Sequence, residues 1–264
     1  MWSGFKDEEK LGGKIPIPQS NTIDAKNMRV AAILAVLARS VDRNIFQPTY
    51  HLDFDSGLRE LFVQQATKNS RRELWCRALL LSMFPQYQEA VATQRCAAVV
   101  HEVMSVVQGL LPGEQIDRFR IRLNQFTESA IDIWKRIQRV KEKLESDFDV
   151  TVYKEMRWQT LKLDGGTASN SEGAEVSNIE DISEVRLVVF PRLYVLDDTK
   201  TVPVTTGVVL KKSHCERAQR EMDETQPGSP VIGRPLNAGA RRRFSRIDEV
   251  TLNGPTTQGR AFLG

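Results

Sequence analysis

The sequence predicts a mainly α fold: a helical bundle of about five helices with a long C-terminal spine helix, plus a small β-hairpin and a disordered tail. Three observations support this prediction. Apolar residues recur at alternating steps of three and four from Ile116 to Leu144, which is the spacing of a helix packed against another helix. Four earlier segments show helical periodicity with capping or helix-breaking residues between them. After residue 150, runs of β-branched residues with prolines replace that pattern.

The chain is expected to begin with a flexible N-terminal arm, residues 1–23. This segment mixes charged residues with glycine and proline and lacks the apolar region of a secretory signal. A first helix is predicted from Asp24 to about Arg43. Its expected core face is apolar and helically spaced: Val30, Ile33, Leu34, Leu37, Val41 and Ile45.

Three further helices are expected next. One carries Leu58 to Ala66, and another opens with the capping-box pair Ser70 and Glu73 before an apolar stretch. A fourth helix begins at Pro85, which suits a first helical turn because it lacks an amide hydrogen. Pro112-Gly113 ends that helix.

The spine helix is predicted from about Glu114 to Ser146, a length of roughly 50 Å at 1.5 Å per residue. Its seam consists of Ile116, Phe119, Leu123, Phe126, Ala130, Ile133, Ile137, Val140 and Leu144. Short connections favour antiparallel neighbours, so residues 24–149 are expected to form one α-helical bundle.

Residues 150–215 are expected to form a strap, a disordered loop at 164–181 and a β-hairpin at 185–210 that packs on the bundle. The loop is rich in Gly, Ser, Asn and acidic residues, and Asp197 to Lys200 has the composition of a turn. Pro191 and Pro203 lack ladder donors, which limits their strands to sheet edges or bulges. Residues 216–264 are predicted to be a mostly disordered C-terminal tail.

Composition indicates an intracellular protein, cytoplasmic or nuclear. The three cysteines, Cys76, Cys96 and Cys215, are far apart and suggest neither a disulfide framework nor a zinc site. The longest apolar run, Val30 to Ala38, is far too short to span a bilayer. The net charge is only +3, and residues 211–264 carry ten Lys or Arg against six Asp or Glu.

No residue pattern indicates a cofactor, a metal or an enzyme class. His101-Glu102 resembles part of a zinc-protease motif, but Ser105 occupies the place of the second histidine. An enzyme whose site is assembled from sequence-distant residues remains the first alternative. A cleft that gathers His101 with carboxylates would favour it.

A basic patch in the tail is the sharpest short motif. It consists of Arg241, Arg242, Arg243 and Arg246 around Ser245. Arginines before a serine are typical of basophilic kinase sites, so Ser245 is a candidate phosphosite. Weak nucleic-acid binding through the patch is a second alternative, and it is disfavoured because no aromatic platform accompanies the arginines.

The C-terminal half of the seam is the candidate partner surface. Its residues are Ile133, Trp134, Ile137, Val140 and Leu144, and intramolecular burial of the same stripe is the competing interpretation. The function predicted from sequence is therefore a non-enzymatic intracellular protein–protein interaction or scaffold module with a phospho-regulated basic tail. The sequence does not specify the partner protein or the oligomeric state, although a monomer is favoured.

Three sequence pieces resemble a family of uncharacterised helical proteins of filamentous fungi. They are Ile45-Phe46-Gln47-Pro48-Thr49-Tyr50, Arg77-Ala78-Leu79-Leu80-Leu81-Ser82 and Ile133-Trp134-Lys135-Arg136-Ile137-Gln138. The resemblance spans about Asp42 to Phe148 and implies a helical domain there. It implies no activity and no catalytic or binding residue.

Overall fold

A computed structural model describes residues 15–51, 57–109, 111–151, 158–162, 181–196 and 201–225. Residues 1–14 of the predicted arm, nearly all of the predicted loop at 164–181 and the tail from residue 226 lie outside these ranges. Ile15, within the predicted arm, packs against the core.

The described residues are mainly α-helical, as predicted. The helices are α1 (Ile23–Asn44), α2 (Leu58–Lys68), α3 (Ser70–Ser82), α4 (Pro85–Val107), α5 (Gly113–Ile137) and α6 (Lys212–Thr225). A short 3₁₀ helix, Ile182–Glu184, precedes the third strand.

Six strands form two three-stranded sheets. The strands are β1 (Lys143–Asp147), β2 (Trp158–Thr160), β3 (Val185–Phe190), β4 (Arg192–Leu196), β5 (Thr201–Pro203) and β6 (Gly207–Lys211). One sheet has the order β1-β4-β5 and the other the order β2-β6-β3. All neighbours are antiparallel except β2 and β6, which are parallel. The single predicted hairpin is therefore replaced by two antiparallel pairs, β4 with β5 and β3 with β6, which belong to different sheets. Strand β1 extends the first pair and β2 extends the second.

The prolines occupy the positions predicted for them. Pro203 lies in β5, at the edge of its sheet, and Pro191 separates β3 from β4. The β3–β6 pairing shifts register between Val188 and Phe190, just before Pro191. At both positions the proline lacks an amide hydrogen that the centre of a sheet would need, so no hydrogen bond between central strands is lost.

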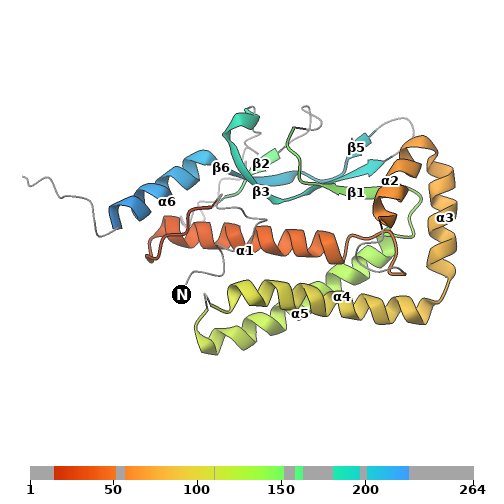
Figure 1. Ribbon diagram of the computed structural model, residues 1–264, viewed down its shortest axis with the longest axis horizontal. Coiled ribbons are helices and arrows are strands. Elements are labelled where there is room, and N and C mark those ends of the chain that lie inside the picture. The colour runs from red at the N-terminus through yellow and green to blue at the C-terminus, as the bar shows by residue number, and fades with distance from the viewer. Residues whose placement is uncertain are drawn as a thin grey trace, which may run out of the picture. The chain divides into compact units, whose positions relative to one another are not determined.

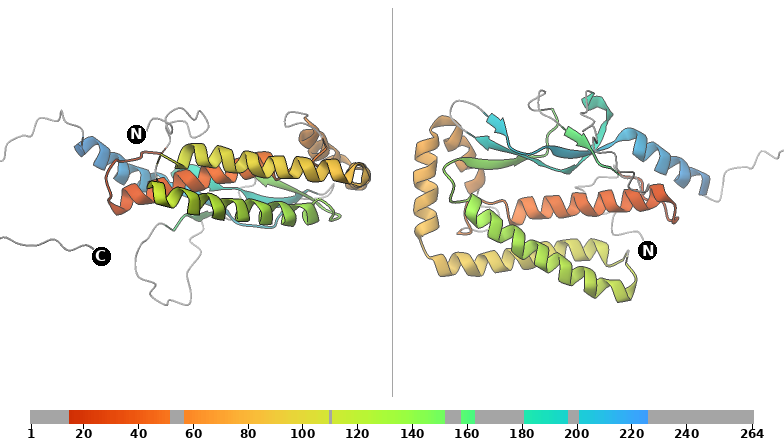
Figure 2. Two further views of the ribbon diagram at one scale, coloured as in Figure 1. Left: turned by 90° about the horizontal axis from the view of Figure 1, so that it is seen from below. Right: turned by 180° about the vertical axis from the view of Figure 1, so that it is seen from behind.

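Helix α1 is the middle layer, with the strands on one side and α4 and α5 on the other (Figure 1; Figure 2). Its buried side chains are mostly small, including Ala31, Ala32, Ala35 and Ala38. Alanine allows close approach of neighbours on more than one side of the helix. The predicted core face was wrong in part, because Val30 is 49% exposed.

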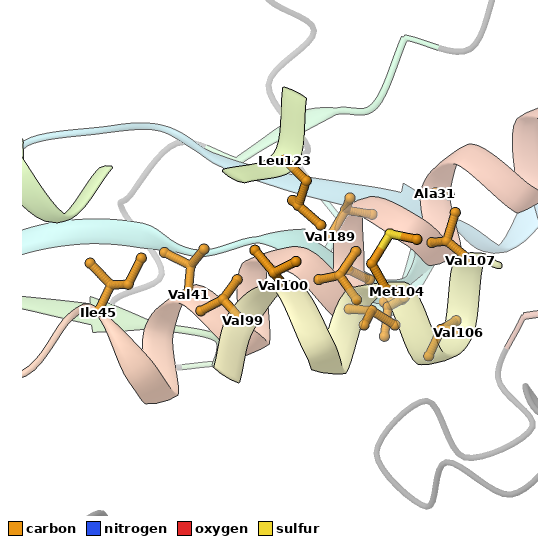
Figure 3. Close-up of a cluster of buried hydrophobic side chains, with 14 of the residues drawn as sticks. Ala31, Val41, Ile45, Val99, Val100, Met104, Val106, Val107, Leu123 and Val189 are labelled. Carbon is orange, nitrogen blue, oxygen red and sulfur yellow. The ribbon is translucent and has the colours of Figure 1, made fainter. Parts of the chain in front are cut away.

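The larger apolar cluster joins the layers (Figure 3). Ala31 and Val41 come from α1, Ile45 follows that helix as its C-cap, and Val99 and Val189 contribute from α4 and β3. The strands therefore pack on the helices, as a marginally stable hairpin requires.

The predicted spine helix is shorter than expected. Helix α5 ends at Ile137, and the chain enters strand β1 at Lys143. The heptad seam also drifts off the buried side: Phe126 and Ile133 are exposed, whereas Thr127 and Trp134 are buried. A straight helix has 3.6 residues per turn, so a strict seven-residue repeat rotates by about 20° per heptad. Long supercoiled packing would correct this drift, and α5 does not form it.

The N-terminus of α3 also differs from prediction. Asn69, not Ser70, is the N-cap, and its side chain accepts a hydrogen bond from the Arg72 amide at 2.8 Å. Glu73 takes no part in a capping box and instead pairs with Arg77 in the interior.

Helix α6 crosses the predicted tail boundary at residue 216. Cys215 and Ala218 are buried in the core. Thr22, the N-cap of α1, donates to Glu221 at 2.8 Å, and Arg217 lies 3.8 Å from Asp24. Few large apolar residues occur in α6, which is why its amphipathic pattern was missed.

Gly207 allows β2 and β6 to approach closely. It is the register partner of Trp158, and a Cβ at Gly207 would lie 2.1 Å from the Trp158 ring. On the same indole, the Arg192 guanidinium lies 4.8 Å from the ring centroid. Any larger residue at position 207 would displace the ring.

Candidate functional site

Helix α3 has an inverted pattern, because it buries charged side chains and exposes apolar ones. Its buried residues are Glu73 and Arg77, whereas Trp75 and Leu79 are 70% and 62% exposed. Trp75 and Leu79 are four residues apart and share one side of the helix. Met83, the C-cap just after α3, is also exposed.

Arg77 explains the inversion. Its guanidinium donates two hydrogen bonds to the Glu73 carboxylate, at 2.7 and 3.1 Å. It also donates to the carbonyl oxygens of Gln138, Val140 and Lys141, which follow α5. These five bonds use all five N–H groups of an arginine. Arg77 therefore fixes α3 to the turn after α5 and has no donor left for a ligand.

Phe84 occupies a strained position between α3 and α4. Among the described residues it alone, apart from glycine, has a positive φ, with φ 46° and ψ 58°. This left-handed conformation costs a residue with a Cβ about 1–2 kcal/mol. Phe84 is nevertheless 64% exposed, so burial of its own ring does not account for the strained position. Strain of this kind is often retained at functional sites.

An aromatic cluster surrounds Phe84. The His51 ring lies edge-on to Phe84, with centroids 5.6 Å apart, and 5.9 Å from the ring of Tyr87. Tyr87 is itself exposed. We refer to the exposed residues Trp75, Leu79, Met83, Phe84 and Tyr87 as the α3 face. Patches of exposed apolar side chains mark interaction sites in soluble proteins.

A hollow of about 270 Å³ lies between α3 and the turn after α5. Leu74, Ala78 and Leu81 of α3 form its apolar wall, and Gln138 and Arg139 stand opposite. The hollow is large enough to receive an apolar side chain from a partner. Buried anchors in such pockets carry much of the free energy of binding at protein interfaces.

Exposed basic residues lie on α3 and in the turn after α5, where Arg139 lines the hollow. Arg71, Arg72, Arg139 and Lys141 are exposed, and none of them forms an ion pair with a described residue. We call these four residues the basic rim. By helical periodicity Arg71 and Arg72 share sides of α3 with Trp75 and Leu79. The only carboxylate of α3, Glu73, is buried against Arg77.

The five residues predicted as a partner surface do not form one exposed stripe. Ile133 and Val140 are exposed, whereas Ile137 and Leu144 are half-buried and pack against the core. The helix ends at Ile137, so no helical stripe continues to Leu144.

Trp134 belongs to the core. It is 4% exposed, donates its Nε1–H to the carbonyl oxygen of Gln47 at 2.8 Å and stacks on Phe46. Its place in the predicted partner surface was therefore wrong.

The candidate phosphosite Ser245 and the basic patch Arg241, Arg242, Arg243 and Arg246 lie outside the described residues. They therefore stay predictions.

The three histidines lie on separate elements. His51 contacts the aromatic cluster, His101 is exposed on α4 and His214 lies on α6. Across the described ranges, no group of three or more His, Cys, Asp or Glu could hold a metal ion. None of the helices described here has the length and apolarity to cross a membrane.

Cysteine reactivity differs along the chain. Burial raises the pKa of the Cys96 thiol and of the Cys215 thiol, so both have less thiolate at neutral pH than an ordinary cysteine. Cys76 is exposed on α3.

Sequence reasoning missed the α3 face. Apolar residues surround the helix on every side from Leu74 to Leu81, so periodicity could not distinguish its inner side from its outer side. One signal was available: Glu73 and Arg77 are four residues apart, the spacing of a helical ion pair.

Comparisons with family models, curated proteins and solved structures found no match for the chain. The resemblance to the fungal helical proteins therefore stays a prediction.

Proposed function

We propose that this chain is a non-enzymatic, intracellular protein-interaction module that binds a protein partner through the α3 face. The observation that carries the proposal is the inversion of α3, which leaves Trp75 and Leu79 in solvent while an ion pair occupies the interior. Exposing a large apolar side chain forgoes roughly 1.5–3 kcal/mol of burial. A partner that covers these side chains would recover that free energy.

The strained Phe84 supports the same proposal. A glycine at this position would have no Cβ clash, and the exposed Phe84 ring contributes only part of its surface to the fold. A benefit in binding would explain an aromatic residue here. Tryptophan and tyrosine, both present on the α3 face, are enriched among residues that dominate interface energetics.

Site-specific photo-crosslinking tests the proposal. A benzophenone amino acid replaces Leu79 in the full-length chain, and in a matched control it replaces Ile121 of α5, which is 58% exposed. In extract from cells that express the chain, we expect position 79 to yield one crosslinked protein and position 121 to yield none. Mass spectrometry identifies that protein, and binding is repeated with the purified partner.

A second variant separates binding from folding. Phe84→Gly should be at least as stable as the original chain, because glycine relieves the left-handed strain of about 1–2 kcal/mol. It should nevertheless weaken binding of the purified partner by about tenfold or more, as loss of an aromatic anchor does. Calorimetric melting and isothermal titration measure the two effects.

Two outcomes would overturn the proposal. One is the absence of any crosslinked partner from position 79. The other is a partner captured only from position 121, which would move the binding site to α5.

A further inference from the structure

We infer that the partner presents an amphipathic helix with acidic residues beside its apolar stripe; this inference rests on the proposed function. The shape of the site gives the first argument. Trp75 and Leu79 form an apolar row on one side of α3, and Met83 follows just after the helix ends. The hollow lies between α3 and Arg139 and is lined by Leu74, Ala78 and Leu81 of the same helix. Helical ligands bind such sites with anchors at i, i+3 or i+4, and i+7.

The charge of the site gives the second argument. The basic rim places Arg71 and Arg72 one turn before the apolar row and Arg139 at the hollow. Glu89, the acidic residue at the start of α4, is already paired with Lys135 at 2.7 Å. Complementary charges guide association and fix the register of an interface. A helix with Asp or Glu at the edges of its apolar stripe matches both the exposed apolar residues of α3 and the basic rim.

The same charges disfavour a second copy of this chain as the occupant. A twofold contact through the α3 face would place one basic rim near another, because the same patch meets itself in such an interface. Like charges brought together at an interface are unfavourable by several kcal/mol.

A nucleic acid fits the site less well than a helix. Single strands stack on successive aromatic rings, whereas aliphatic Leu79 and Met83 separate Trp75 from Phe84 along the row. Leu74, Ala78 and Leu81 also make the wall of the hollow aliphatic. Packing against aliphatic side chains is typical of helix-in-groove recognition.

A displayed peptide library tests the inference on the full-length chain. Each member is an 18-residue helix with Leu or Phe at four anchor positions and a random choice of Asp, Glu, Lys, Arg, Gln and Ser elsewhere. We expect the selected peptides to be rich in Asp and Glu beside the anchors. Their affinity should fall as salt rises, because exposed charge pairs are screened.

Matched variants locate the binding site of a selected peptide. The double reversal Arg72→Glu with Arg139→Glu should weaken binding by about tenfold or more, and so should Leu79→Ser. The control reversal Arg118→Glu with Arg122→Glu changes two exposed arginines of α5 and should leave affinity unchanged. Fluorescence anisotropy with each purified full-length variant provides the dissociation constants.

The outcomes distinguish this inference from the proposed function. The inference would be overturned if binding depends on Leu79 but the selected peptides are not enriched in Asp and Glu. It would also be overturned if the Arg72 and Arg139 charge reversal leaves their affinity unchanged. In either case the α3 face would still be a binding site. Peptides whose affinity is unchanged by Leu79→Ser would contradict both the inference and the proposed function. Failure to enrich any peptide would overturn the inference, while crosslinking from position 79 still decides the function.

Two further probes cover other classes of ligand. A 20-nucleotide single-stranded DNA and vesicles containing phosphatidylserine are each titrated into the same variants. Stronger binding of either probe than of the selected peptides, with the same dependence on Leu79 and Arg72, would overturn the inference.

Discussion

Tyr50 is a buried polar residue that is held by specific partners. It is 1% exposed, its hydroxyl donates to the carbonyl oxygen of Ile45 at 2.9 Å, and the Arg95 guanidinium lies 5.5 Å from its ring centroid. Burial raises the pKa of Tyr50 far above its ordinary value, although Arg95 acts in the opposite direction. The folded protein therefore keeps Tyr50 protonated at a pH where the unfolded chain releases the proton.

Tyr50 should make the protein unstable in alkali. Its folded-state pKa is raised, so its contribution to stability is complete below the unfolded pKa of about 10 and is lost as pH rises above that value. Above pH 10 the original chain should lose about 1.4 kcal/mol more per pH unit than Tyr50→Phe does.

Urea unfolding at pH 8 and at pH 11 measures this difference. At pH 8 Tyr50→Phe should be less stable by roughly 1 kcal/mol, because the hydrogen bond to Ile45 is lost. Equal pH slopes for the two proteins would show that Tyr50 can ionise within the fold.

Ion pairs take the place of apolar residues on the inner sides of two elements. In α3 the pair is Glu73 and Arg77. In β1 the buried side chains are Lys143 and Glu145, whose charged atoms lie 2.6 Å apart. Arg59 of α2 also contacts Glu145, so charged groups fix both β1 and α3 beside the rest of the molecule.

Breaking the α3 pair should be costly. Arg77→Met leaves the Glu73 carboxylate buried without its partner and should lower the free energy of unfolding by about 3–5 kcal/mol. The double variant Glu73→Leu with Arg77→Met should recover part of this loss, because no unpaired charge remains. Guanidinium unfolding of the two single variants and the double variant gives the coupling energy. A cost below 1 kcal/mol for Arg77→Met would show that water reaches this site.

These ion pairs also explain where prediction from sequence succeeded and where it failed. Helices α1 to α4 were predicted because apolar spacing and the prolines between them agree there. Strand β1 was assigned to the spine helix because Val140 and Leu144 continue the seam spacing, while its buried residues are the charged Lys143 and Glu145. The α3 face was missed for the same reason. Apolar periodicity predicts the inner side of an element only when apolar residues occupy that side.

At the scale of the whole described molecule, α1 holds the layers together. The strands cover one side of it and α4 and α5 another (Figure 2), while α6 packs near its N-terminus through Thr22 and Glu221. No single neighbour covers the helix alone. The stability of α1 therefore depends on segments from both ends of the described chain.

Removing α6 should destabilise the fold. A chain that ends at Lys211 loses the buried Cys215 and Ala218 and the contacts of Glu221 with Thr22. We expect a loss of about 2–4 kcal/mol from the exposed apolar area, measured by urea unfolding. The matched control is a chain that ends at Thr225 and keeps α6. Equal unfolding midpoints for the two chains would contradict a structural role for α6.

The central position of α1 has a consequence for synthesis on the ribosome. Helix α1 is complete at Asn44, but β3, which covers one of its sides, does not begin until Val185. Translation proceeds at about 5–20 residues per second, so this side of α1 stays uncovered for roughly 7–28 s. During this interval the nascent chain carries an uncovered apolar surface of the kind that chaperones bind, and aggregation during translation should be most severe for chains stopped before β3.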